Sequence, residues 1–217
     1  MGKSIYSLVL SDDVVEAVDA LANSSGISRS AMVNRILAER VAYTTPEMRL
    51  EEILESLARS MNSAFMLAER PSGGTLSART SLKYRYKPTV KYSVEIFTEN
   101  GHRMGEMKVS FRTQSAQLID DLTGFFKCWA SLEQRYIADK LSGDILYTIS
   151  DGQFRRTLNM PGGNISDEQL GIAVADYMAM FDGAMKAYFL RLPDGEGASS
   201  AAGEYYRQEI SRQAVIV

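Results

Sequence analysis

The residue types that most often carry catalysis or bind metals are scarce in this chain. Of its 217 residues, one is histidine and one is cysteine. With His102 and Cys128 as its single histidine and cysteine, the chain cannot build the multi-histidine or multi-cysteine sites that hold zinc, nickel or iron–sulfur clusters. Cys128 stands beside Trp129 in a predicted helix, a position more typical of a packed thiol than of a nucleophile. We expect no enzyme, no metal site and no cofactor.

A second group with potential chemistry is a basic strip at residues 83–87, where lysine and arginine alternate with two tyrosines and Lys91 follows. Cations interleaved with aromatic rings are able to contact phosphates and stack bases. The alternation is also that of a strand whose tyrosines pack inward and whose charges face water. We favour the second interpretation, although the eight basic and three acidic residues of 79–112 keep the first open.

The net charge of the chain is the sum of segments whose charges differ in sign. It has 24 basic and 27 acidic residues, a formal charge of −3, whereas nucleic-acid binders are usually basic overall. Residues 79–112 are basic and residues 113–217 are acidic. Any binding of nucleic acid must therefore depend on a shaped interface, because non-specific attraction by the whole chain is weak.

Three features of the sequence indicate the cellular compartment in which we expect the protein. A lone cysteine cannot form an intramolecular disulfide and suits a reducing environment. The N-terminal residues do not resemble a signal peptide, and no apolar run reaches membrane-spanning length. We expect a cytoplasmic protein with no membrane partner.

The first 41 residues predict a strand, a helix, a tight turn and a second helix. Residues 4–10 alternate with the period of a strand that buries one face, and this face carries Tyr6, Leu8 and Leu10. Ser11 caps the first helix, Gly26 ends it, and Ser28 caps the second. Since the strand has no partner in this segment, the simplest solution is a dimer in which two strands pair as an antiparallel ribbon.

The remaining chain predicts an α+β domain with antiparallel strands and three long helices. Pro46 begins a helix that extends to residue 68, a meander of strands follows over 81–112, and further helices cover 114–141 and 166–190 with a hairpin between them. The domains expected are 1–45, 46–192 and a flexible tail, 193–217. Six aromatic residues fill the core or line a pocket: Tyr84, Tyr86, Tyr92, Phe125, Trp129 and Tyr136.

Two short segments carry a resemblance to a known family. Residues 6–12, Tyr-Ser-Leu-Val-Leu-Ser-Asp, and residues 26–32, Gly-Ile-Ser-Arg-Ser-Ala-Met, resemble the ribbon-helix-helix DNA-binding proteins of the Arc, MetJ and CopG group. The resemblance covers residues 3–41, about a fifth of the chain. It implies an N-terminal ribbon-helix-helix module that dimerises and places its ribbon in the major groove of double-stranded DNA.

The resemblance also implies which residues contact DNA. The outward face of the ribbon would contact bases, and the start of the second helix would hold phosphates through amides and hydroxyls. Ile5 and Val9 depart from the polar residues common in such ribbons, and they offer only apolar contact to thymine methyl groups. The expected base contacts are Lys3, Ile5, Ser7 and Val9, and the expected phosphate contacts are Ser28, Arg29 and Ser30.

These observations predict a homodimeric, sequence-specific DNA-binding protein, a transcriptional repressor that forms higher oligomers where dimers lie adjacent on DNA. A plasmid partition or conjugation accessory protein remains an alternative, as does an antitoxin-like module that binds another protein. Residues 46–192 would supply oligomerisation, a protein partner or a small ligand. The nickel-responsive regulators of this family are excluded, because their histidine cluster is missing here.

Overall fold

The computed structural model describes residues 4–68, 73–85, 87–97, 101–150, 152–192 and 196–217. The chain divides into two compact units, Met1–Met48 and Arg49–Val217. The helices are α1 Asp12–Ser25, α2 Arg29–Arg40, α3 Pro46–Ser60, α4 Ala116–Tyr136, α5 Asp167–Arg191 and α6 Glu196–Ile210, with a 3-10 turn at Ala138–Lys140. The strands are β1 Met66–Leu67, β2 Thr75–Ser81, β3 Thr89–Ile96, β4 Arg103–Phe111, β5 Tyr147–Ser150 and β6 Gln153–Asn159.

The first unit consists mainly of two short helices with a very small core. Gly26 ends α1 in the left-handed conformation at φ 66°, and Ser28 caps α2 by accepting a hydrogen bond from the amide of Ala31 at 3.2 Å. Both features were predicted, whereas Ser11 precedes α1 without a side-chain capping bond. Among the described residues of this unit, the hydrophobic cluster is Val18, Ala22 and Met32, with Val33 packed at its edge.

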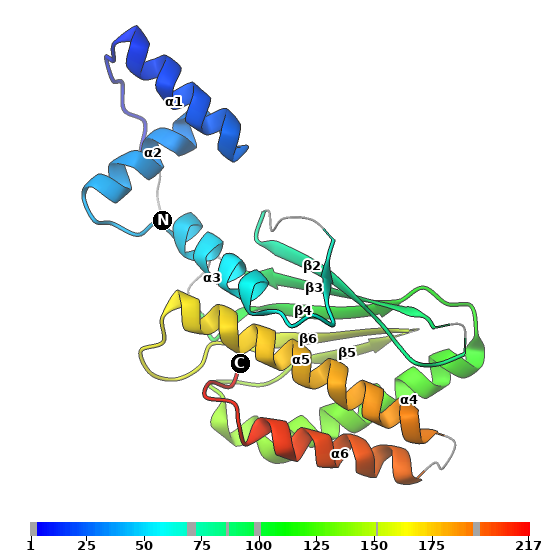
Figure 1. Ribbon diagram of the computed structural model, residues 1–217. Coiled ribbons are helices and arrows are strands. Elements are labelled where there is room, and N and C mark those ends of the chain that lie inside the picture. The colour runs from blue at the N-terminus through cyan, green and yellow to red at the C-terminus, as the bar shows by residue number, and fades with distance from the viewer. Residues whose placement is uncertain (1–3, 69–72, 86, 98–100, 151, 193–195) are drawn as a thin grey trace. The chain divides into compact units, whose positions relative to one another are not determined.

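The second unit is built on an antiparallel sheet with the strand order β1-β2-β3-β4-β6-β5. Figure 1 shows α4 and α5 lying along one face of this sheet, with α6 beside them. Aromatic rings join the layers: Phe126 of α4 stacks on Phe154 of β6 at 5.1 Å between ring centroids, and Phe181 of α5 lies at 5.3 Å from the same ring. This unit has the predicted α+β composition.

The helices contact each other closely where glycine occupies the interface. A β-carbon at Gly171 of α5 would lie 2.5 Å from the carbonyl oxygen of Ile53 and 2.7 Å from the amide nitrogen of Leu57, both in α3. A β-carbon at Gly183 would meet the Tyr205 ring of α6 in the same way. Both glycines therefore permit close contact between neighbouring helices, and any larger residue at these positions would push the helices apart.

Three predictions of the chain's organisation are wrong. Residues 193–217 were expected to be a flexible tail, but α6 occupies 196–210 and buries Ala198, Ala202 and Tyr206 against the core. Helix α3 ends at Ser60 and not at residue 68, since Asn62 begins a turn by accepting from the Ala64 amide at 2.9 Å. The first strand of the meander is β2 at 75–81, and residues 82–85 form a turn.

Candidate nucleic-acid interface

The predicted ribbon has no regular secondary structure in the single chain. Residues 4–10 make no strand pairing, as expected for a strand whose partner would come from a second copy. Ile5 and Val9 are fully exposed, and Ser7 is also exposed. Lys3, the remaining predicted base contact, lies outside the described residues.

The face of this segment expected to be buried is exposed as well. Tyr6 is 81% exposed and Leu8 is 60% exposed, and Leu10 is exposed beside them. The apolar surface continues over the helices of the first unit at Val14, Leu21, Ile27, Ile36, Leu37 and Val41. With a core of three buried residues beneath it, this unit leaves most of its apolar surface in water, which is typical of an unoccupied protein interface.

The start of α2 offers backbone amides to an anion. Ser28 has extended dihedral angles (φ −72°, ψ 155°), its hydroxyl accepts from Ala31, and the first turn of α2 contains no acidic residue. Arg29 and Ser30 occupy that turn and are exposed. A helix N-terminus without a nearby carboxylate on its own element favours a bound phosphate.

Arg29 is already engaged within the protein. Its Nε and Nη2 groups donate to the two carboxylate oxygens of Asp19 on α1, a bidentate pair that links the two helices. The hydrogen bond from Arg29 lowers the pKa of the Asp19 carboxyl. To contact a phosphate, Arg29 must exchange this partner or share its guanidinium. Sequence reasoning missed the pair because the two residues lie ten positions apart on different helices.

The described residues of the basic strip, 83–85 and 87, belong to a turn region and not to a strand. Tyr84 packs its ring edge against Phe189 at 5.5 Å and donates its hydroxyl to Asp121 at 2.9 Å. Lys83, Arg85 and Lys87 are exposed, and Tyr86 lies outside the described residues. The packing of Tyr84 matches the interpretation favoured from the sequence, in which the tyrosines serve the core.

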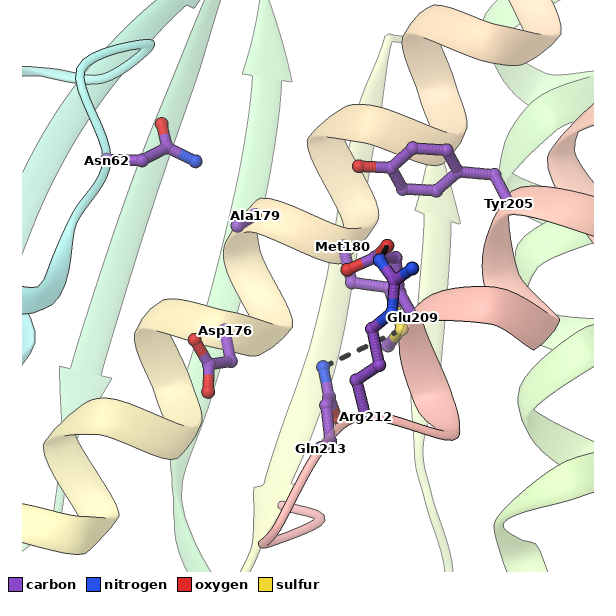
Figure 2. A pocket seen from close by; sticks show the side chains of 8 residues that line it. All are labelled: Asn62, Asp176, Ala179, Met180, Tyr205, Glu209, Arg212 and Gln213. Atoms are coloured by element: carbon purple, nitrogen blue, oxygen red, sulfur yellow. Dashed lines mark hydrogen bonds and ion pairs between the residues drawn. The ribbon is translucent and has the colours of Figure 1, made fainter.

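A polar cavity of about 320 Å³ lies between α5 and α6. Figure 2 shows Asp176 and Glu209 at its wall, where Arg212 forms an ion pair with Glu209 at 2.7 Å. Burial and the neighbouring Glu209 raise the pKa of Asp176. The aromatic residues proposed to line a pocket are not found here: Tyr92, Phe125 and Trp129 are fully buried in the core.

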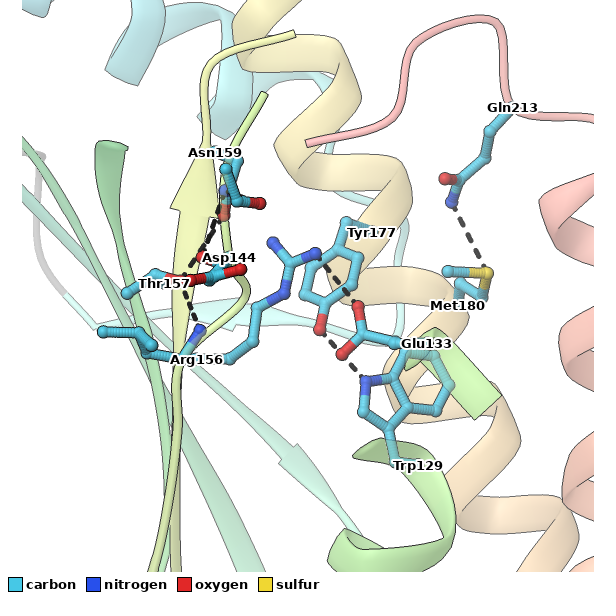
Figure 3. Close-up of polar contacts among 11 residues, drawn as sticks. Trp129, Glu133, Asp144, Arg156, Thr157, Asn159, Tyr177, Met180 and Gln213 are labelled. Carbon is cyan, nitrogen blue, oxygen red and sulfur yellow. Dashed lines mark hydrogen bonds and ion pairs between the residues drawn. The ribbon is translucent and has the colours of Figure 1, made fainter. Parts of the chain in front are cut away.

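A pair of buried charges was not foreseen. Arg156 of β6 and Glu133 of α4 are fully buried, with Nη2 and Oε1 3.0 Å apart. Figure 3 shows this pair beside Tyr177, whose ring centre lies 4.6 Å from the Arg156 guanidinium carbon and whose hydroxyl accepts from Trp129 at 3.1 Å. Burial raises the pKa of Glu133 against the opposing effect of Arg156. The pair is enclosed by core side chains and opens to no described cavity.

Within the residues that the structure describes, no group of three or more His, Cys, Asp or Glu side chains could hold a metal ion. Cys128 is half-buried, and burial raises the pKa of its thiol, which disfavours the reactive thiolate. None of the described helices is long and apolar enough to cross a membrane.

Comparison with known proteins identifies a family for one segment of the chain. Searches of curated proteins and of solved structures found no match. Residues 7–44 match the family model described as ribbon-helix-helix protein, copG family, which agrees with the resemblance found at residues 3–41. A match to this family indicates DNA binding, typically in transcription regulators. The N-terminal unit of this chain is therefore a ribbon-helix-helix domain of the copG type.

Proposed function

We propose that the protein is a homodimeric, sequence-specific DNA-binding protein that represses transcription by occupying operator DNA. The observation that carries this proposal is the exposed apolar face of residues 6–10, at the start of the segment 7–44 that matches the copG family. Pairing of two such segments would provide hydrogen-bond partners for their backbone N–H and C=O groups. It would also bury Tyr6, Leu8 and Leu10 between the protomers. The ribbon would then present Ile5, Ser7 and Val9 to the major groove.

The phosphate contacts in this proposal lie at the start of α2. Ser28 fixes the helix start, and the exposed amides and hydroxyl of Arg29 and Ser30 would hold one backbone phosphate on each half of the operator. The charge of Arg29 would add to this contact once it turns from Asp19. Repression follows because a dimer bound over a promoter excludes polymerase, with adjacent dimers reinforcing occupancy.

A mobility-shift titration with DNA from upstream of the protein's own gene tests this function. The wild-type protein should bind that duplex more tightly than a scrambled duplex of equal length. Ser7→Ala should reduce this discrimination, by roughly 1 kcal/mol for each protomer. Arg29→Ala should weaken binding to both duplexes and lower the slope of log affinity against log salt by about 1 for each protomer.

The matched control for Arg29→Ala is Asp19→Asn, which breaks the same ion pair but keeps the guanidinium. Binding by Asp19→Asn should equal or exceed that of the wild type, because Arg29 is released for phosphate. Equal losses in the two variants would mean that Arg29 acts only by joining α1 to α2. Equal wild-type affinity for both duplexes would contradict sequence-specific binding.

A further inference from the structure

One face of the sheet in the second unit is not covered by the helices. The apolar face packs against α4 and α5 (Figure 1), while the residues that alternate with it are exposed or half-exposed. Strand register sets these residues in rows that cross five strands. One row is Arg79, Lys91, Ser110, Gln153 and Ser150, and the next is Ser77, Ser93, Lys108, Arg155 and Thr148. We call these two rows the open sheet face.

The four cations of the open sheet face form two like-charged pairs. Arg79 lies directly opposite Lys91 on β2 and β3, and Lys108 lies directly opposite Arg155 on β4 and β6. Like charges directly opposite each other destabilise a sheet. The cations are therefore arranged at a cost to the fold, although the chain as a whole has a net charge of −3.

Most of this positive charge is not neutralised within the protein. Arg155 forms an ion pair with Glu106 at 2.9 Å, and Glu106 and Glu95 stand opposite each other in the adjoining row. The side chains of Arg79, Lys91 and Lys108 have no ion-pair partner among the described residues. Four strands about 4.8 Å apart, with a step of about 7 Å along the strands between the two rows, place the cations along a diagonal of about 16 Å, flanked by serine and threonine hydroxyls.

We propose that the open sheet face binds the phosphate backbone of duplex DNA. Unpaired cations and hydroxyls are the groups that hold phosphates, and a diagonal of this length spans more than one phosphate of a strand. The two rows contain no aromatic residue, so the face lacks the stacking platforms used to bind single strands. This inference rests on the proposed function, because the duplex is the one that the ribbon would recognise.

The test uses the full chain carrying Arg79→Thr, Lys91→Thr and Lys108→Thr together. Threonine suits strands and the like-charged pairs are relieved, so the variant should be at least as stable to heat as the wild type. A control removes the same charge from exposed helical positions with Lys127→Gln, Arg135→Gln and Arg207→Gln. Affinities for a selected duplex and a scrambled duplex are measured by fluorescence anisotropy between about 50 and 300 mM salt, a range over which the Debye length falls from roughly 14 Å to roughly 6 Å.

The sheet variant should lose on the order of 100-fold in affinity for both duplexes at about 0.1 M salt, and its salt slope should fall by about 2 to 3. The helical control should keep the wild-type slope. An unchanged slope in the sheet variant would overturn this inference and would point to an acidic protein as the occupant of the face. Failure of the proposed function has a different signature, namely equal wild-type affinity for the selected and scrambled duplexes.

Discussion

Leu8→Asp is expected to leave the protein monomeric and to lower its affinity for duplex DNA by about 100-fold or more. Leu8 belongs to the apolar face of residues 6–10, which is exposed in the single chain and would be buried in the paired ribbon. An unpaired carboxylate in that interface would cost several kcal/mol, more than the contacts of one leucine supply. Sedimentation velocity measures the oligomeric state, and fluorescence anisotropy measures the affinity.

The neighbouring position provides the matched control. Val9 points to the opposite face of the predicted strand, so Val9→Asp should leave the dimer intact and weaken DNA binding alone, because its carboxylate would face bases and phosphates. A dimer formed by Leu8→Asp would contradict the pairing of the two ribbons. Loss of the dimer in Val9→Asp would contradict the assignment of the two faces.

The second large effect is expected at the buried ion pair of the C-terminal unit. Arg156→Met should lower the free energy of unfolding by about 3–5 kcal/mol, because Glu133 would remain buried without a counter-charge. Met fills a similar volume, so loss of charge rather than a cavity dominates the effect. Chemical denaturation monitored by the fluorescence of Trp129, which lies beside the pair, measures the change.

Two comparisons separate charge from packing in that experiment. Arg156→Met combined with Glu133→Leu should recover most of the lost stability, since apolar pairs replace buried ion pairs at little cost. Burial raises the pKa of Glu133, and removal of Arg156 removes the interaction that opposes this rise. A carboxyl whose pKa is raised in the folded state costs nothing at a pH where both states are protonated. Its destabilising effect grows as the pH rises above the unfolded-state pKa and is complete above the folded-state pKa. The defect of Arg156→Met should therefore shrink as the pH falls, and a defect that does not change with pH would contradict this explanation.

Local signals predicted the elements well where the chain itself determines them. Ser166 begins α5 with a full capping box to Gln169, and strands β3 and β4 fall where apolar residues alternate. The apolar stripe of α5 does face the core, with Val174 and Phe181 fully buried. Caps and periodicity are local properties, and this is why single-sequence reasoning recovered them.

The errors arise where distant contacts decide the structure. Helix α6 is rich in alanine, glycine and serine, which predicted a mobile tail, yet it buries Ala198, Ala202 and Tyr206 in the core. The close contact with α5 comes from Gly183 of α5, which leaves room for the ring of Tyr205. Strand β2 is mostly polar on its outer face, so alternating tyrosines farther along the chain gave a stronger signal than the true strand. Arg156 lies between the buried Phe154 and Leu158, and that alternation was the available sign that its charge would be buried.

The residues assigned to the candidate interface stay a prediction, and their partners within the protein were not predicted. Ser28 caps α2 as expected, whereas the bidentate pair of Arg29 with Asp19 depends on how two helices pack. The cations of the open sheet face come together only through the register of four strands, and no spacing in the sequence shows this.

The most direct test of the central claim is a dimethyl sulfate footprint of the wild-type protein on a selected duplex. A ribbon in the major groove should protect guanine N7 atoms there in two symmetric half-sites, since N7 is a major-groove atom. Leu8→Asp should abolish this protection. Adenine N3 atoms of the minor groove between the protected guanines should remain reactive. Protection confined to adenine N3, or unaltered by Leu8→Asp, would contradict a dimeric ribbon that binds the major groove.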